Sequence, residues 1–178
     1  ASNLAGKGTA VYGSGLTGAI GDYSSASALT SEYDTASTED TDVAVTITGT
    51  LSTTDHISAL NRLAAETSGN ITATITAGAS VVAGISGISN KNTTITVNDA
   101  VSLSGYNTAD ATTSNAVQVT GSISDSLNNL YDASNGGGGS RAAVLNTAIA
   151  GDNDLNIVIS DSKLVSGNFG ALNAVVGN

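Results

Sequence analysis

The chain has 178 residues and a formal net charge of −10, with no Cys, Met, Trp or Pro, five Tyr and one Phe. The charge argues against nucleic acid and anionic lipid as partners, because both need clustered Lys and Arg. The absence of Cys removes disulfide and thiolate chemistry, and the scarcity of aromatic residues predicts a core of Val, Ile, Leu and Ala. No apolar run approaches the roughly 20 residues of a membrane span, so we expect no membrane insertion.

Residues 1–42 form the first predicted unit, in which glycines separate short apolar phrases such as Thr9–Tyr12 and Gly18–Ile20. We interpret this unit as a Gly-rich N-terminal cap, with a polymerisation arm that pairs with a neighbouring subunit and a flexible leader as alternatives. Five acidic residues follow between Glu32 and Asp42. Such a run usually forms a solvated loop, and it lacks the spacing of an EF-hand calcium loop.

From Val43 the sequence alternates apolar and Thr side chains, reading V-A-V-T-I-T, which is typical of a strand with one buried face. Similar phrases begin at Ile71, Thr93, Ala116 and Leu155. Their recurrence at intervals of roughly 20–40 residues indicates one repeating unit, as in stacked repeat architectures. We therefore assign residues 43–178 to a second unit, a repeat array.

The segment Ser52–Glu66 carries the clearest helix pattern in the chain. Its apolar residues fall on one stripe, formed by Ile57, Leu60, Leu63 and Ala64. Ser52 and Asp55 have the spacing of a capping box, and Gly69 is a candidate for a left-handed helix end. The segment predicts a helix that returns the chain between two strands.

A glycine-rich stretch near residues 134–140 interrupts the repeat pattern. We interpret it as a flexible insertion that bulges from one repeat, and it also has the composition of a laboratory linker.

These patterns predict a mainly β fold, a parallel β-solenoid with short helical segments in the returning arcs and right-handed connections. An antiparallel β-sandwich of about eight short strands is the alternative.

The residues that could carry chemistry are few. His56 is the only histidine, and a triad would require a nucleophile and an orienting acid beside it. Four candidate carboxylates for glycoside hydrolysis occupy predicted turns or caps, where Asp commonly accepts backbone hydrogen bonds; they are Asp99, Asp110, Asp125 and Asp132. No Gly-rich phosphate-binding motif is present. We therefore expect no catalytic site and no cofactor.

Asp152 and Asp154 are the best metal candidates. They alternate with Asn153 directly after Gly151, and oxygen ligands at alternating positions suit Ca²⁺. The competing interpretation is a polar turn that precedes a strand.

The strand phrases resemble repeats of large secreted surface proteins of cyanobacteria and other Gram-negative bacteria. The resemblance includes Ile95–Asp99 and the spacing of Asp55 from Leu60-Asn61. This resemblance, to S-layer-like and adhesin-like proteins, covers about residues 43–178. It implies a structural or adhesive role, a secreted or cell-surface location, and often Ca²⁺. The calcium-binding nonapeptide G-G-x-G-x-D of some such proteins is absent here.

The predicted function is a structural subunit of an extracellular filament, surface layer or adhesin. Copies would assemble head-to-tail into a homo-oligomer or polymer, because an array ending at Asn178 without a cap leaves an exposed strand edge. The alternatives are a virion fibre or receptor-binding protein, an ice-binding protein that uses the outward Thr residues, and a carbohydrate-active enzyme. Contact with glycans fits several of these functions.

Overall fold

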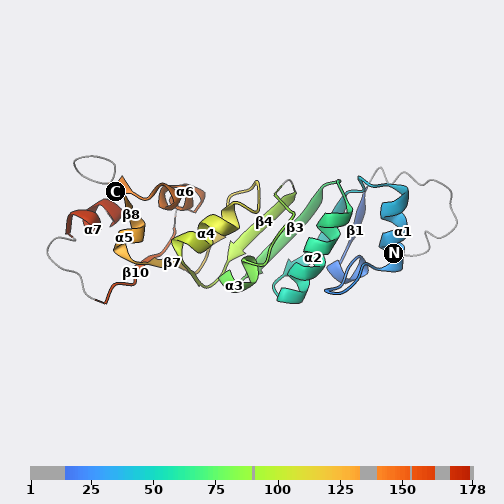
Figure 1. Cartoon of the computed structure of the whole chain (residues 1–178), viewed down its shortest axis with the longest axis horizontal. Coiled ribbons are helices and arrows are strands. Elements are labelled where there is room, and N and C mark those ends of the chain that lie inside the picture. Colours follow the sequence, from blue (N-terminus) through green and yellow to red (C-terminus); the bar gives the residue numbers. More distant parts are fainter. Residues whose placement is uncertain (1–14, 90, 133–139, 153, 163–168, 177–178) are drawn as a thin grey trace.

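The computed structural model describes residues 15–89, 91–132, 140–152, 154–162 and 169–176. The molecule is elongated, with strands stacked along its length and helices packed beside them (Figure 1). It is a mixed α/β protein, and within the described residues 38% are helical and 27% are in strands. The prediction of a mainly β parallel β-solenoid is therefore wrong.

Two parallel sheets form the framework. The larger has the order β1 (Leu16–Gly18), β2 (Val45–Leu51), β3 (Ile71–Ala77), β4 (Asn92–Val97) and β6 (Gln118–Val119). The smaller has the order β10 (Ile157–Ile159), β7 (Ser122–Asp125) and β5 (Ala100–Val101). Every pairing in both sheets is parallel, so the alternative of an antiparallel sandwich is also wrong. Among the described residues, antiparallel pairing occurs in two places. β8 (Tyr131–Asp132) pairs with β9 (Ser140–Arg141), and Ser24 forms an isolated bridge with Leu29.

The helices are more numerous than the sequence pattern suggests. The chain contains η1 (Ile20–Asp22), α1 (Ser31–Glu39), α2 (Thr54–Glu66), α3 (Ala79–Val82), α4 (Leu103–Asp110), α5 (Leu127–Leu130), α6 (Ala143–Gly151) and α7 (Phe169–Val176). Several are short and contain Gly or β-branched residues, so propensity alone does not favour them. They form because their apolar side chains pack into the shared core, as Val82 and Tyr106 do.

The five strand phrases found in the sequence all form strands, but they do not share one sheet. Those near Val43, Ile71, Thr93 and Ala116 become β2, β3, β4 and β6, whereas the phrase from Leu155 becomes β10 of the smaller sheet. Inward residues such as Val45, Ile71 and Ile95 are buried. The outward Thr side chains are exposed or half-buried.

Helix α2 closely matches its prediction, and its apolar stripe is buried in the core. Its ends differ from expectation. The side chain of Thr53, not Ser52, accepts a hydrogen bond from the His56 N–H, and Thr67 is the C-cap. Gly69 does not adopt a left-handed conformation. It is required because a Cβ there would collide with the carbonyl oxygens of Asp42 and Val43.

The N-terminal unit contributes to the same sheet as the repeats. Strand β1 pairs in parallel with β2, and the Leu16 N–H donates to the Ala44 carbonyl at 2.8 Å. In the same unit, the rings of Tyr23 and Tyr33 pack edge to face with centroids 5.9 Å apart. The Thr9–Tyr12 phrase and residues 134–139 of the glycine-rich stretch lie outside the described residues.

Candidate functional site

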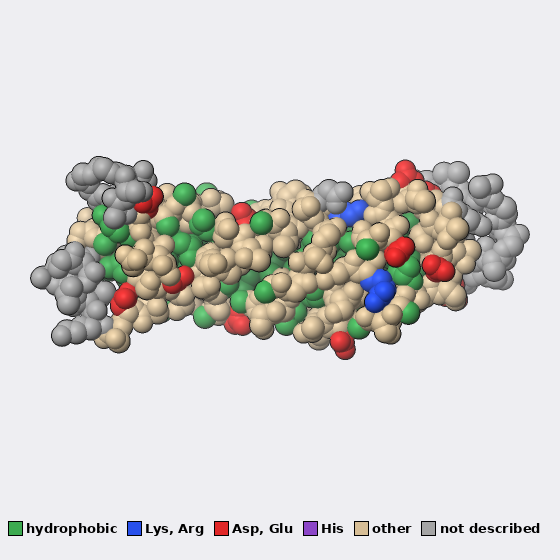
Figure 2. All heavy atoms as spheres, in the orientation of Figure 1, with side chains coloured by type: hydrophobic (Ala, Val, Ile, Leu, Met, Phe, Trp, Pro, Cys, Tyr) green, Lys and Arg blue, Asp and Glu red, His purple; other side chains and the backbone are tan. Residues whose placement is uncertain are grey.

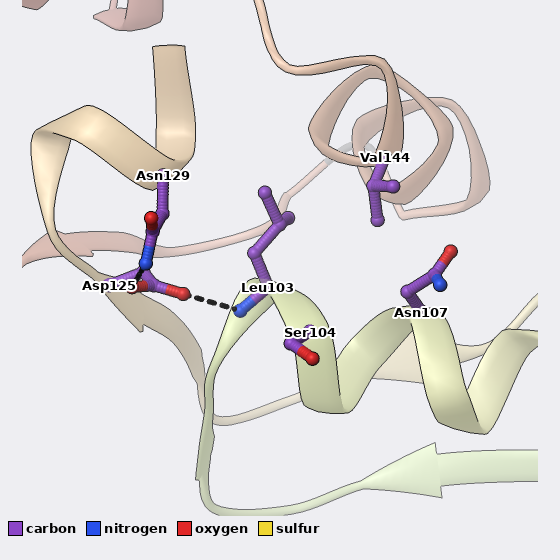
Figure 3. Close-up of a pocket in the computed structure, with 6 residues that line it drawn as sticks. All are labelled: Leu103, Ser104, Asn107, Asp125, Asn129 and Val144. Atoms are coloured by element: carbon purple, nitrogen blue, oxygen red, sulfur yellow. Dashed lines mark hydrogen bonds between the residues drawn. The ribbon is translucent and has the colours of Figure 1, made fainter. Parts of the chain in front are cut away.

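A shallow pocket lies between α4, α5 and α6, with a volume of about 320 Å³ (Figure 3). Its lining is formed by Leu103, Ser104, Asn107, Asp125, Asn129 and Val144. The side chains of Leu103 and Val144 form its apolar part, and Asp125 and Asn129 lie together at one side (Figure 3). Asp125 is the only titratable group in this lining, so its environment decides what chemistry the pocket supports.

The Asp125 carboxylate is occupied by three donors. One oxygen accepts the Leu103 N–H at 3.0 Å, and the other accepts the Ser126 N–H at 2.8 Å and the Asn129 side-chain amide at 2.7 Å. Burial alone raises the pKa of Asp125, but these hydrogen bonds outweigh it and lower the pKa below its ordinary value. A carboxylate held ionised in this way is suited to capping a helix rather than to transferring a proton near neutral pH.

Asp125 is one of three aspartates with the same role. Asp99 accepts the Ala79 N–H at 2.7 Å, and Asp161 accepts the Leu127 N–H at 2.6 Å. In each case the aspartate lies at or just after the end of a strand and caps a helix 20, 22 or 34 residues earlier in the chain. These side chains therefore tie one strand–helix layer to the next.

Threonine and asparagine side chains make similar links at the other ends of the strands. Thr67 donates to the Val43 carbonyl at 2.8 Å, and Thr113 donates to the Thr93 carbonyl at 2.9 Å. The Asn70 side chain accepts the backbone N–H of Asn92 at 3.0 Å, and Asn92 accepts from the Asn115 side chain at 3.2 Å. The strand pattern alone did not reveal these links, because each joins residues more than 19 positions apart.

A second pocket, of about 350 Å³, lies beside Tyr106, Asp110 and Thr147. Burial, followed by the charges of Asp110 and Asp152, raises the pKa of Tyr106 to about 12. A phenol with this pKa stays protonated at neutral pH, and no histidine or lysine lines the pocket among the described residues. Among its described lining residues, therefore, the hydroxyl groups have no histidine or lysine beside them to serve as a general base.

His56 and the remaining carboxylates are dispersed. The Nδ1 atom of His56 accepts the Ser52 N–H at 3.2 Å, so it serves the first turn of α2. Asp110 ends α4, and Asp132 lies in β8. Of the four carboxylates considered for glycoside hydrolysis, Asp99 and Asp125 cap different helices, and the other two lie on different elements, α4 and β8.

Asp152 closes a strand edge. Its side chain is 6% exposed and accepts the Val119 N–H at 2.8 Å, so it supplies to β6 the acceptor that a further strand would otherwise provide. Asp154 is exposed, and its interaction with Asp152 raises the pKa of Asp154. No group of three or more His, Cys, Asp or Glu that could hold a metal ion occurs among the described residues. Ca²⁺ binding at Asp152 and Asp154 stays a prediction.

The edge of β10 differs from that of β6. β7 is the only described strand that pairs with β10. In the middle of β10, Val158 is 41% exposed and is the only large hydrophobic side chain classed as exposed in the described part of the chain. An apolar strand with an open edge is a ready site for pairing with another chain.

No family model, curated protein or solved structure matches this chain. The resemblance to repeats of bacterial surface proteins thus stays a prediction. Within the described ranges, no helix is long and apolar enough to span a membrane. The candidate functional site that the structure supports best is the β10 edge, which the sequence did not distinguish from the other strand phrases.

Proposed function

We propose that this chain is a structural module of an extracellular assembly, such as a filament, a surface layer or an adhesin, and that its copies join through exposed strand edges. The single observation that carries the proposal is the β10 edge, where an uncharged apolar strand has one unpaired side among the described residues and an exposed valine.

The use of polar side chains along the chain supports this function. Four aspartates and two threonines bond to backbone groups of a neighbouring layer, 20 or more positions away in the chain; they are Asp99, Asp125, Asp152, Asp161, Thr67 and Thr113. On the face that Figure 2 shows, acidic side chains are scattered along the molecule instead of forming one charged patch. Side-chain hydrogen bonds between neighbouring layers favour a stiff, elongated shape, which suits a building unit of an assembly.

The experiment is sedimentation velocity combined with electron microscopy over a range of protein concentrations, with and without Ca²⁺ and Mg²⁺. We expect concentration-dependent association into dimers and longer particles. A chain that stays monomeric under all these conditions would contradict the proposed function. Ordered particles would also distinguish a structural module from the alternative of a carbohydrate-active enzyme, which a glycan turnover assay would detect.

A second candidate, ice binding, is favoured by the register of the larger sheet. Its outward face carries aligned rows, in which Thr46 lies beside Thr72 and Thr74 lies beside both Thr50 and Thr94. The bulge at Gly49, where φ is +80°, interrupts these rows in β2. The test is thermal hysteresis of the wild-type chain against a Thr74→Lys variant. Ice crystals that grow without hindrance in wild-type solution would remove this candidate.

A further inference from the structure

The direction of the backbone groups along β10 can be derived from two hydrogen bonds. The Asn156 carbonyl accepts the Ile123 N–H at 2.8 Å, and the Ser160 N–H donates to the Asp125 carbonyl at 2.8 Å. Residues 156 and 160 therefore turn their backbone groups toward β7. Because these groups alternate along a strand, the N–H and C=O of Ile157 and Ile159 point away from β7, to the side on which no described strand pairs with β10.

The other described edges are poor partners for this strand. β6 is closed by the Asp152 carboxylate, and β5, β8 and β9 have only two residues each. β1 has three residues, and since Leu16 bonds to β2, only Thr17 turns its backbone groups outward. The edge that best matches β10 in length and apolar character is β10 of a second copy.

We propose that two copies of this chain pair through their β10 strands, antiparallel and about a two-fold axis at Val158. This inference rests on the proposed function and names its partner and geometry. In this register, Ile157 of each copy faces Ile159 of the other, and both residues use their outward N–H and C=O groups. The two Val158 side chains meet as a pair without hydrogen bonds, in which Cα atoms lie about 4.5 Å apart.

Charge is compatible with this register. The strand is flanked by the exposed Asp154 and Asp161. With the axis at Val158, Asp161 faces Leu155 of the second copy and Asp154 faces Ser162, so no two carboxylates stand directly opposite each other. Pairing centred between residues 157 and 158 would place Asp154 opposite Asp161, which like-charge repulsion disfavours. In that register Ile157, whose backbone N–H and C=O point toward the second copy, would face Val158, whose backbone groups point toward β7.

The test uses the absence of native Cys. In Val158→Cys the two Cα atoms at the axis would lie within the roughly 4.4–6.8 Å range of disulfides, so oxidation by air with a copper catalyst should convert most of the chain to a disulfide-linked dimer. Thr94→Cys is the matched control, because Thr94 is exposed in the middle of the larger sheet. We expect it to stay mainly monomeric under the same conditions.

A second variant, Val158→Lys, places two like charges at the axis. We expect its dimer dissociation constant, measured by sedimentation, to be about tenfold or more above that of the wild type. Val158 and Thr94 are both exposed, so circular dichroism should show an unchanged fold in all three variants. If Val158→Lys weakens association while Val158→Cys gives no more disulfide than Thr94→Cys, the two-fold pairing is wrong and the proposed function survives with another contact at this edge. If the wild-type chain never associates, both proposals fall.

Discussion

The carboxylate of Asp125 accepts the backbone N–H of Leu103 at 3.0 Å, which joins the end of β7 to the first turn of α4. The same side chain also accepts from Ser126 and Asn129. One aspartate thereby fixes two layers of the stack, and its loss should affect stability more than the loss of an exposed charge.

We predict that Asp125→Asn lowers the free energy of unfolding by ~1–3 kcal/mol, because an amide has one acceptor oxygen and its NH₂ group would oppose a donor. The measurement is urea denaturation at pH 7. Asp55→Asn is the control, since Asp55 is exposed in the first turn of α2 and should change stability by only a few tenths of a kcal/mol. Equal effects of the two variants would contradict the layer-joining role.

The same carboxylate predicts an acid-sensitive fold. Its pKa is lowered in the folded state, so the unfolded chain binds a proton first as the pH falls. The stabilisation is present above the unfolded-state pKa, near 4, and is lost as the pH falls through the folded-state value. Urea midpoints of the wild type should fall across this range, and those of Asp125→Asn should fall less. Parallel pH curves would be the contrary result.

Gly69 provides a test of close packing between layers. A Cβ at this position would collide with the carbonyl oxygens of Asp42 and Val43, so Gly69→Ala must displace backbone. We expect a loss of ~1–3 kcal/mol, of the size seen for overpacked sites, in thermal or urea denaturation. Gly21→Ala is the matched control, because nothing lies within 4 Å of a Cβ there. A destabilised control with an unaffected Gly69→Ala would refute this account of the packing.

Lys91 is a structural cation that the sequence did not single out. It is 3% exposed, and its Nζ donates to the carbonyls of Thr67 at 2.9 Å and Gly69 at 2.5 Å, beyond the end of α2. Burial lowers the pKa of this ammonium group. Lys91→Met keeps the apolar stem but leaves both carbonyls without this donor, so we expect a loss of ~1–3 kcal/mol. The exposed neighbour Ser89 offers a control, Ser89→Ala. Unchanged or increased stability of Lys91→Met would show that desolvating the charge costs as much as its hydrogen bonds contribute.

Two buried tyrosines predict the alkaline limit of the fold. Burial is the main cause that raises the pKa of Tyr33 and Tyr106 to about 12. Since the unfolded-state value is near 10, stability is fully present below pH 10 and is lost as the pH rises toward 12. The tyrosinate absorbance that wild type shows and Tyr106→Phe lacks should appear together with the change in circular dichroism. Tyr106→Phe should shift unfolding to higher pH, and appearance of this difference absorbance at pH 10 without loss of structure would contradict the prediction.

The larger sheet shows how far the sequence pattern extends. The alternation of Val, Ile and Thr located β2, β3 and β4 to within a few residues, because a half-buried strand needs that period whatever its neighbours are. The stripe of α2 was found for the same reason. The shorter helices were expected only in general, as helical segments in the returning arcs. Their positions, such as Ala79–Val82 and Leu103–Asp110, were not located, because these segments are helical through packing against the core and not through local preference.

The candidate site was less predictable than the fold. Asp99, Asp125 and Asp152 were recognised as turn, cap or metal candidates, but their partners lie 20 to 33 residues away in the chain. The Leu155 phrase resembled the other strand phrases, and nothing local indicated that it would become the exposed strand of a separate sheet.

The sequence by itself determined the strand segments, the main helix, the acidic charge and the aliphatic core, because these depend on composition and on periods of a few residues. Only the tertiary structure decided how many helices form, that the strands divide between two parallel sheets, and that β10 pairs on one side only among the described strands. These features depend on hydrogen bonds and packing between layers distant in the chain, and no local pattern encodes which backbone groups stay unpaired once those layers are assembled.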